Sequence, residues 1–346
     1  MGLLDHKVDY VGVDIGANGI RVVQLKANAA KPELVTYGHV ATPPGMTTSD
    51  SPTDVARTAQ AVRQLVKDAR VTAKAVVAGV GSEKVFASII TTPKLPEHDL
   101  AKSIQLQADQ YIPMAVKDVK LDWYVIGPGK NDTEQEVLLV AAPNAATEKY
   151  ISIFGQAGLE LLALEPNAIA LARAVIQPND LAVMTLDVGT LSSDITIVQA
   201  NMPKLLRSIN IGGNTFIKAV GQNLGLDDAQ AEQFTQKFGL TQTKLEGQVL
   251  KAIKPSLDQL VGEIEKSVKF FMGQYPEIKL EKLVLTGGTT ALPELPTYLS
   301  TATGLAVEIA NSWVKVAYPA NLQDQLMAAS TQYGVAVGLA ERDLLQ

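Results

Sequence analysis

The chain lacks cysteine altogether, and its histidines are few and far apart. Among its 346 residues there is no cysteine, which excludes disulfide bonds and thiolate catalysis and is compatible with a reducing cytosol. The three histidines, His6, His39 and His98, show no metal-ligand spacing and are expected on the surface or in loops. The sequence therefore contains no pattern typical of a zinc site or a thiol enzyme.

Long apolar runs are missing as well. No window supplies the roughly 18 apolar residues that a membrane-spanning helix needs, so no direct membrane insertion is expected. Residues 1–10 lack the basic start and the uninterrupted apolar stretch of a secretory signal. The net charge of −6 argues against nucleic acid as a partner. Hydrophobic residues still make up 47% of the chain, and its length indicates two domains or a few subdomains.

Two short segments of the chain are alike. Residues 11–25, VGVDIGANGIRVVQL, and residues 184–199, MTLDVGTLSSDITIVQ, each consist of an apolar strand, an Asp-x-Gly turn and a second strand. Glycine in such a turn lets backbone N–H groups approach a phosphate, and the aspartate can face a divalent cation or its waters. Because Asp14 and Asp187 are half a chain apart, we expect two similar halves that face one nucleotide.

The order of the first elements argues against a Rossmann fold. Alternating and β-branched runs predict strands and one amphipathic helix, in the order strand 10–14, strand 20–26, strand 34–41, helix 52–69 and strand 75–80. A Rossmann domain would place a helix directly after the first strand and its glycine turn. A mixed sheet is therefore expected.

The middle of the chain has the pattern of an inserted module. Its predicted elements are a strand at 85–91, a helix after Pro96, strands at 122–126 and 136–143, and a helix at 145–157 that leads back to the first domain. The next helix is predicted over 164–176 and begins with Glu165-Pro166, since proline is tolerated in a first turn.

The second half is predicted to be mostly helical before it returns to a strand. Helical patterns cover 214–224, 227–237 and 256–274, and Pro255 is expected to break the pattern before the last of these. An apolar strand at 282–290 contains Gly287-Gly288, and an apolar helix with two glycines follows at 331–342.

The first hairpin, the Glu-Pro helix, the second hairpin, the Gly-Gly strand and the closing helix resemble, in this order, the five signatures of the actin-like ATPase superfamily. The resemblance implies an α/β fold of two similar halves around a nucleotide cleft, with an inserted strand-helix-strand-strand module. The implied domains are a first actin-like domain (1–82 and 157–178), the insert (83–156), a second actin-like domain (179–213 and 281–346) and a helical nucleotide-covering subdomain (214–280).

The same resemblance implies ATP and Mg²⁺ as cofactors and assigns roles to residues. The implied nucleotide-binding residues are Asp14, Gly16, Ala17, Asn18, Gly19, Arg21, Gly189, Thr190, Gly212, Gly213, Asn214, Glu263, Lys266, Gly287, Gly288 and Thr289. Asp14, Asp187 and Asp194 would hold the metal, mostly through water. Asp187 and Glu165 are the candidate general bases, although either could instead serve a water-mediated metal site. Asn167 would occupy the place where actin has a polar amide, and Glu263 with Lys266 could also be an ordinary solvated helix face.

The insert narrows the resemblance to one family. ADQYIP at 108–113 and LDWYV at 121–125 resemble the pattern of the PilM family of type IV pilus assembly proteins, a group related to FtsA. Residues 2–16 and 333–342 resemble that family too. An amphipathic membrane-binding tail of the kind that FtsA proteins carry is not expected here.

What the PilM resemblance implies is an ATP-binding adaptor in the cytoplasm, peripheral to the inner face of the inner membrane through a partner. That partner is the cytoplasmic N-terminal segment of a PilN-like inner-membrane protein. Other pilus motor or platform proteins and a homo-oligomer are also possible partners. Ala17-Asn18-Gly19 stands where relatives commonly have Ser or Thr, which predicts slow hydrolysis or none. An FtsA-like filament-forming ATPase and a small-molecule kinase on the same fold are the alternatives.

Overall fold

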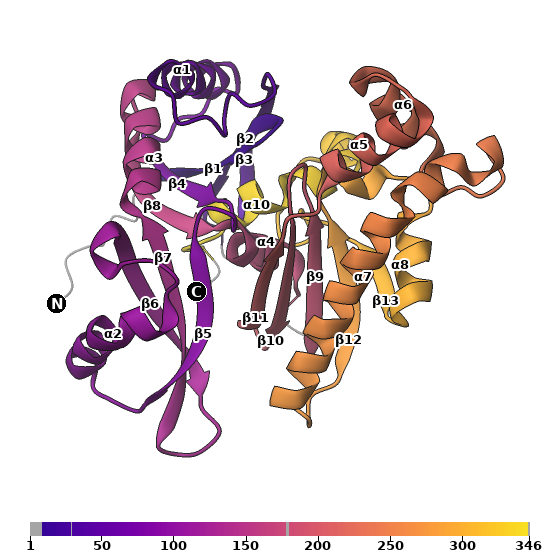
Figure 1. Cartoon of the computed structure of the whole chain (residues 1–346). Coiled ribbons are helices and arrows are strands. Elements are labelled where there is room, and N and C mark those ends of the chain that lie inside the picture. Colours follow the sequence, from indigo (N-terminus) through magenta and orange to yellow (C-terminus); the bar gives the residue numbers. More distant parts are fainter. Residues whose placement is uncertain (1–8, 29, 178–179, 345–346) are drawn as a thin grey trace.

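The structure is a computed structural model that describes residues 9–28, 30–177 and 180–344. His6, the family-like opening at 2–8 and the domain boundary expected at 178/179 lie outside these residues. His39 and His98 are exposed, as expected. Three sheets and the helices around them form the molecule (Figure 1). In the described part of the chain, no helix is both long and apolar enough to cross a membrane.

The first half is built on a five-stranded mixed sheet with the order β3-β2-β1-β4-β8. Three antiparallel strands come first, and two strands parallel to β1 complete the sheet: β1 (Tyr10–Gly16), β2 (Gly19–Lys26), β3 (Glu33–Ala41), β4 (Ala75–Val80) and β8 (Glu160–Pro166). Helices α1 (Pro52–Asp68) and α3 (Asn144–Ala157) share one apolar core with this sheet. Ser51 caps α1, because its side chain accepts the N–H of Asp54.

The second half repeats this topology. Its sheet has the order β11-β10-β9-β12-β13, again three antiparallel strands followed by two parallel ones: β9 (Ala182–Val188), β10 (Ser193–Gln199), β11 (Met202–Ile209), β12 (Leu280–Thr286) and β13 (Ala306–Ile309). The helices that follow β11 and β12 are α5 (Gly213–Leu224), α6 (Asp228–Phe238), α7 (Gln248–Gln274) and α8 (Leu295–Thr303). The matching strand orders confirm the predicted architecture of two similar halves.

Two helices lie between the two sheets: α4 (Asn167–Val175) and α10 (Ser330–Ala340), the latter preceded by the short α9 (Gln323–Ala328) (Figure 1). Most of α10 is buried, as expected for a helix that is apolar on all sides. It approaches its neighbours closely. A Cβ atom placed on Gly338 would lie 1.7 Å from the carbonyl oxygen of Ala170, and one on Gly12 of β1 would lie 2.4 Å from that of Ala336. Only glycine fits at these two contacts.

The insert forms a sheet of its own, with the order β5-β7-β6. Its elements are β5 (Phe86–Pro93), α2 (Glu97–Tyr111), β6 (Val119–Pro128) and β7 (Glu134–Pro143), which confirms the predicted strand-helix-strand-strand order. Polar contacts join it to the second half. Glu136 of β7 is buried and forms an ion pair with Lys204 of β11 and a hydrogen bond from the hydroxyl of Tyr275, each at 2.5 Å.

Two predictions about proline were wrong. Glu165 and Pro166 end strand β8 and do not begin a helix. Residue Glu165, which precedes the proline, favours an extended backbone, and both residues pair with β4. Pro255 does not break α7 but lies within it, on the exposed face of a helix that begins at Gln248. The carbonyl group left without an amide partner on that face can be hydrated, and the apolar face of α7 remains packed on the sheet.

Three strands were not predicted. They are β8, β11 and β13, which all lie at the edges of their sheets and are only partly buried. Their polar and apolar residues alternate weakly, so periodicity alone does not distinguish them from loops. The division of the chain into domains stays a prediction.

The contact between α10 and α4 leads to a prediction about stability. Gly338→Ala should lower the free energy of unfolding by about 3 kcal/mol or more, because the new methyl group meets the carbonyl of Ala170. Gly262→Ala is the matched control, since a Cβ there meets nothing within 4 Å, and should raise that free energy by about 0.5–1 kcal/mol. Urea unfolding followed by circular dichroism measures both. Equal stability of the two variants would contradict the prediction.

Candidate functional site

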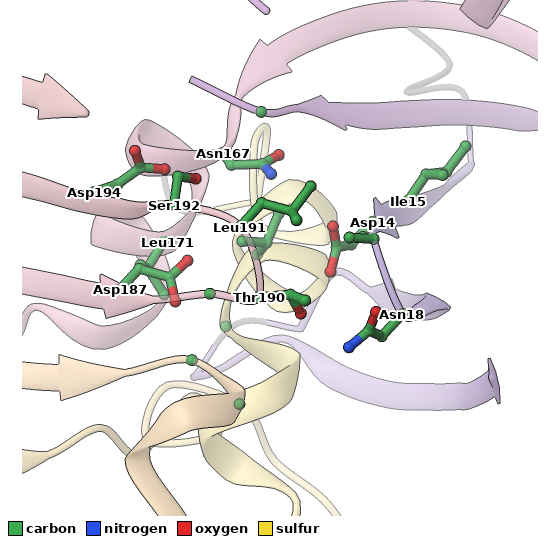
Figure 2. Close-up of a pocket in the computed structure, with 18 of the residues that line it drawn as sticks. Asp14, Ile15, Asn18, Asn167, Leu171, Asp187, Thr190, Leu191, Ser192 and Asp194 are labelled. Carbon is green, nitrogen blue, oxygen red and sulfur yellow. The ribbon is translucent and has the colours of Figure 1, made fainter. Parts of the chain in front are cut away.

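A cleft lies between the two halves, where the turns of the two Asp-x-Gly hairpins face each other (Figure 2). Its space is about 1020 Å³ with the open mouth included. Asp14 and Asn18 lie on the side of the first half, and Asp187, Thr190 and Asp194 lie on the side of the second half. The other predicted residues that line the cleft are Gly16, Ala17, Arg21, Gly189, Gly287 and Gly288.

The first hairpin carries one negative and one positive charge. Asp14 on β1 and Arg21 on β2 are directly opposite each other, and the guanidinium lies 3.5 Å from the carboxylate. Burial raises the pKa of Asp14, and the positive charge of Arg21 acts against that rise. The turn itself consists of Ala17 and Asn18. Thr47 supports this turn, because its hydroxyl donates to the carbonyl of Gly16 at 2.9 Å.

The second hairpin carries two negative charges at the equivalent positions. Asp187 on β9 is directly opposite Asp194 on β10. The pKa of Asp187 is raised to about 7 by burial, by the charge of Asp194 and by the charge of Asp14. Burial also raises the pKa of Asp194 to about 6, although hydroxyl groups of Ser208 and Ser82 donate to it, the latter at 3.0 Å. Two carboxylates so placed favour a bound cation.

Several buried polar atoms in the cleft have no hydrogen-bond partner among the residues that the structure describes. They are Oδ1 of Asp194, Oδ1 of Asn167 and Nε of Arg21. Such atoms cost free energy unless a ligand or water satisfies them, so the cleft fits a ligand that carries both negative and positive groups. Asn167 can lie here because Gly79 has no side chain: a Cβ on Gly79 would be 2.2 Å from Oδ1 of Asn167. A magnesium nucleotide fits this set of donors and acceptors.

The predicted glycine corner supports the second turn and does not line the cleft. The N–H groups of Gly213 and Asn214 donate at 2.9 Å to the carbonyls of Gly189 and Thr190. The hydroxyl of Thr289 reaches the same Gly189 carbonyl at 3.2 Å. The neighbouring Gly212 closes this corner, since a Cβ there would lie 2.7 Å from the carbonyl of Thr190. These residues fix the shape of the turn and do not face the cleft.

Gly287 is required for a different reason. Its φ of +96° suits glycine, and a Cβ there would lie 2.5 Å from a carboxylate oxygen of Asp187. The end of β12 can therefore lie directly beside Asp187.

Four further predicted site residues do not line the cleft and have other contacts. Both carboxylate oxygens of Glu165 accept hydrogen bonds from Arg173, one of them at 3.0 Å, so this pair holds the side chain outside the cleft. Glu263 pairs with Lys266 at 2.7 Å and also with Arg207 of β11. Gly19 pairs with Gly16 across the first turn. Glu263 and Lys266 on α7 therefore pair as expected for an ordinary solvated helix face, which was the alternative to a nucleotide-binding role.

Other residues line the cleft that the sequence did not indicate. They are Thr48, Glu83, Lys84, Tyr150 and Gln332, among others. They come from loops and helices that are far apart in the chain, and none belongs to a local pattern. Only the packing of the two halves brings them to the hairpins.

No cluster of three or more acidic or histidine side chains suited to a metal ion occurs among residues 9–28, 30–177 and 180–344. A cation in this cleft would therefore be held by one or two carboxylates together with water and ligand oxygens. Mg²⁺ commonly binds in this way beside phosphates. Asp187 and Asp194 are the side chains placed to contribute.

Two equivalent sheets that each present an Asp-x-Gly hairpin to a shared cleft define the class of actin-like ATPases. Two solved structures share this fold: EutJ from Carboxydothermus hydrogenoformans (TM-score 0.56, 15% identity, 97% of this chain and 89% of that one) and MreB 5 of Spiroplasma citri bound to AMPPNP (0.54, 11%, 98% and 96%). The family described as type IV pilus assembly protein PilM matches residues 12–344, so the chain belongs to the PilM family.

A further structure is more similar. It is described as the PilM-PilN type IV pilus biogenesis complex, with a TM-score of 0.86 and 26% identity over 98% of this chain and 100% of that one. The likeness therefore extends over the insert and both halves.

The raised pKa of Asp187 predicts how stability depends on pH. Because its pKa in the folded state lies above its ordinary value of 3.8, the contribution of Asp187 to the free energy of unfolding should fall as the pH rises from about 4 to about 7. Asp187→Asn removes this loss. At pH 8 the variant should exceed wild type in free energy of unfolding by about 1–3 kcal/mol, a range lowered because the carboxylate is partly exposed to water. At pH 4 the two proteins should be almost equally stable.

Urea unfolding at pH 4, 6 and 8 checks this prediction. Asp109→Asn on the exposed face of α2 removes the same charge and should follow wild type at each pH. A pH-independent difference between wild type and Asp187→Asn would contradict it.

Proposed function

We propose that this protein is a nucleotide-loaded adaptor of type IV pilus assembly. It binds ATP·Mg²⁺ in the cleft and docks the cytoplasmic N-terminal segment of a PilN-like inner-membrane protein. This places it in the cytoplasm, beneath the inner membrane and attached through that partner. The observation that carries the proposal is the pair of facing hairpins with unpaired polar atoms between them, in a chain of the PilM family.

The two hairpins have different roles in this proposal. Backbone groups of the first turn, together with Arg21, bind phosphate oxygens. Asp187 and Asp194 orient the metal through its waters, and a bound cation would offset the burial that raises their pKa values. Bound Mg²⁺ would neutralise phosphate charge. Gly287 and Gly288, at the end of β12, leave room for the nucleoside.

Slow hydrolysis or none is part of the proposal. Glu165 is occupied by Arg173, so Asp187 is the remaining candidate base. The first turn has Ala17 where a serine or threonine hydroxyl could donate to a phosphate. The second turn contains Leu191, which has no side-chain donor. Few side-chain donors are thus available for the charge that develops in a transition state.

The nucleotide proposal is tested by calorimetry with ATP·Mg²⁺. Wild type should bind, and Asp187→Asn should bind at least about tenfold more weakly, because a cation-binding carboxylate is lost. Asp109→Asn should bind like wild type. Since Asp187→Asn is expected to be the more stable protein at neutral pH, weaker binding could not be attributed to unfolding. Undiminished binding by this variant would contradict the proposed metal site.

The partner proposal is tested with a synthetic peptide that covers the cytoplasmic N-terminal segment of the PilN-like protein. Fluorescence anisotropy of the labelled peptide should show saturable binding to wild type and to Asp187→Asn, since the peptide site does not depend on this carboxylate. A peptide of the same composition in scrambled order is the control. Equal binding of the two peptides would refute a specific docking site.

A further inference from the structure

We propose that Lys84 binds the terminal phosphate of the bound nucleotide and thereby makes the cleft prefer ATP to ADP. The inference rests on the proposed function, because it assumes a nucleotide in the cleft. Lys84 lies in the loop between β4, which ends at Val80, and β5, which begins at Phe86. It therefore lies just before the first strand of the insert.

Lys84 is a positively charged residue in the wall of the cleft that is available to bind an anion. Its side chain lines the cleft together with Thr48, and in the described part of the chain its ammonium group has no hydrogen bond or ion pair. The nearby Lys149 is fully engaged: its ammonium donates to the carbonyls of Thr47 at 3.2 Å and Ser49 at 2.5 Å and pairs with Asp50 at 2.8 Å. Lys84 is free to bind an anion, and Lys149 is not.

The surroundings of Lys84 favour such an anion. Its pKa is lowered, first by burial and then by the positive charge of Lys149, while Glu83 and Asp50 act in the opposite direction. A partly buried ammonium group beside another cation is unfavourable until a negative group approaches it. Arg21, the other cation of the cleft, already contacts Asp14 at 3.5 Å and Gln332 at 3.4 Å. A phosphate would thus find its least engaged cation at Lys84.

The position of Lys84 selects the terminal phosphate. Lys149 holds the Thr47 carbonyl, and the hydroxyl of Thr47 holds the first turn at Gly16. Because Lys84 is close enough to Lys149 and Asp50 for their charges to interact, it lies on the same wall of the cleft as the first turn. Gly287 and Gly288, where the nucleoside is proposed to lie, belong to the second half. A nucleotide with its nucleoside there extends its phosphates toward the first half and brings the last of them to Lys84.

The contact has a consequence for the insert. Val85 and Phe86 follow Lys84 directly, and Phe86 is the first residue of β5. A phosphate bound to Lys84 restrains the start of this strand, whereas ADP leaves it unrestrained. The γ-phosphate would in this way reach the insert through one side chain.

The test compares the affinities for ATP·Mg²⁺ and ADP·Mg²⁺ by calorimetry on the full chain. Lys84→Gln should weaken ATP binding about tenfold and change ADP binding less than twofold, as expected for the loss of one charged contact to the last phosphate. Lys84→Arg keeps the charge and should retain most of the preference for ATP. Lys102→Gln on exposed α2 removes the same charge away from the cleft and should change neither affinity.

The outcomes separate this inference from the function on which it rests. Wild type that binds neither nucleotide would overturn both. If wild type binds both nucleotides, an equal weakening of ATP and ADP by Lys84→Gln, or no weakening, would overturn the inference alone. Thermal unfolding of each variant without nucleotide shows whether it is folded. Hydrogen exchange at residues 81–90 should be slower with ATP than with ADP in wild type and equal in Lys84→Gln.

Discussion

The close approach of α10 to α4 and β1 fixes how the first sheet packs against the two helices between the halves. Glycine at positions 12 and 338 lets backbone meet backbone with no side chain between them. These contacts join the first sheet closely to the two helices that lie between the sheets. The cleft lies between the two halves that these helices connect, and Asp14 and Asp187, from opposite halves, both line it.

Different groups support the two turns. The second turn is bonded to the first residues of α5 and to Thr289, whereas the first turn is bonded to Thr47, on the loop that Lys149 holds in place, and to the N–H of Thr42, which donates to the carbonyl of Asn18 at 3.2 Å. Residues that never touch a ligand can thus be as necessary to binding as those that do. The Gly212-Gly213-Asn214 corner belongs to this supporting group, which explains why its sequence pattern accompanies the binding site without being part of its surface.

Local chemistry explains which parts of the fold and site were predictable from the sequence. The Asp-x-Gly hairpins were predictable because strand alternation and turn glycines act over a few residues. Glu165 was misplaced because Pro166 is compatible both with a helix start and with a strand end, and only the pairing with β4 decides between them. Glu263 and Lys266 suit either a ligand or each other. Lys84 gave no signal, since its neighbours in space come from loops far away in the chain.

The two halves share their topology, yet one pair of equivalent positions differs in charge. Each aspartate is opposite the residue seven places later, which is Arg21 in the first hairpin and Asp194 in the second. The cleft is therefore electrically polar although its scaffold is nearly symmetric. A ligand that carries an anion at one end and a cation beside it has unequal energies in its two possible directions. The molecule thus distinguishes the head of a ligand from its tail through the opposite charges of Arg21 and Asp194 at equivalent positions of the two hairpins.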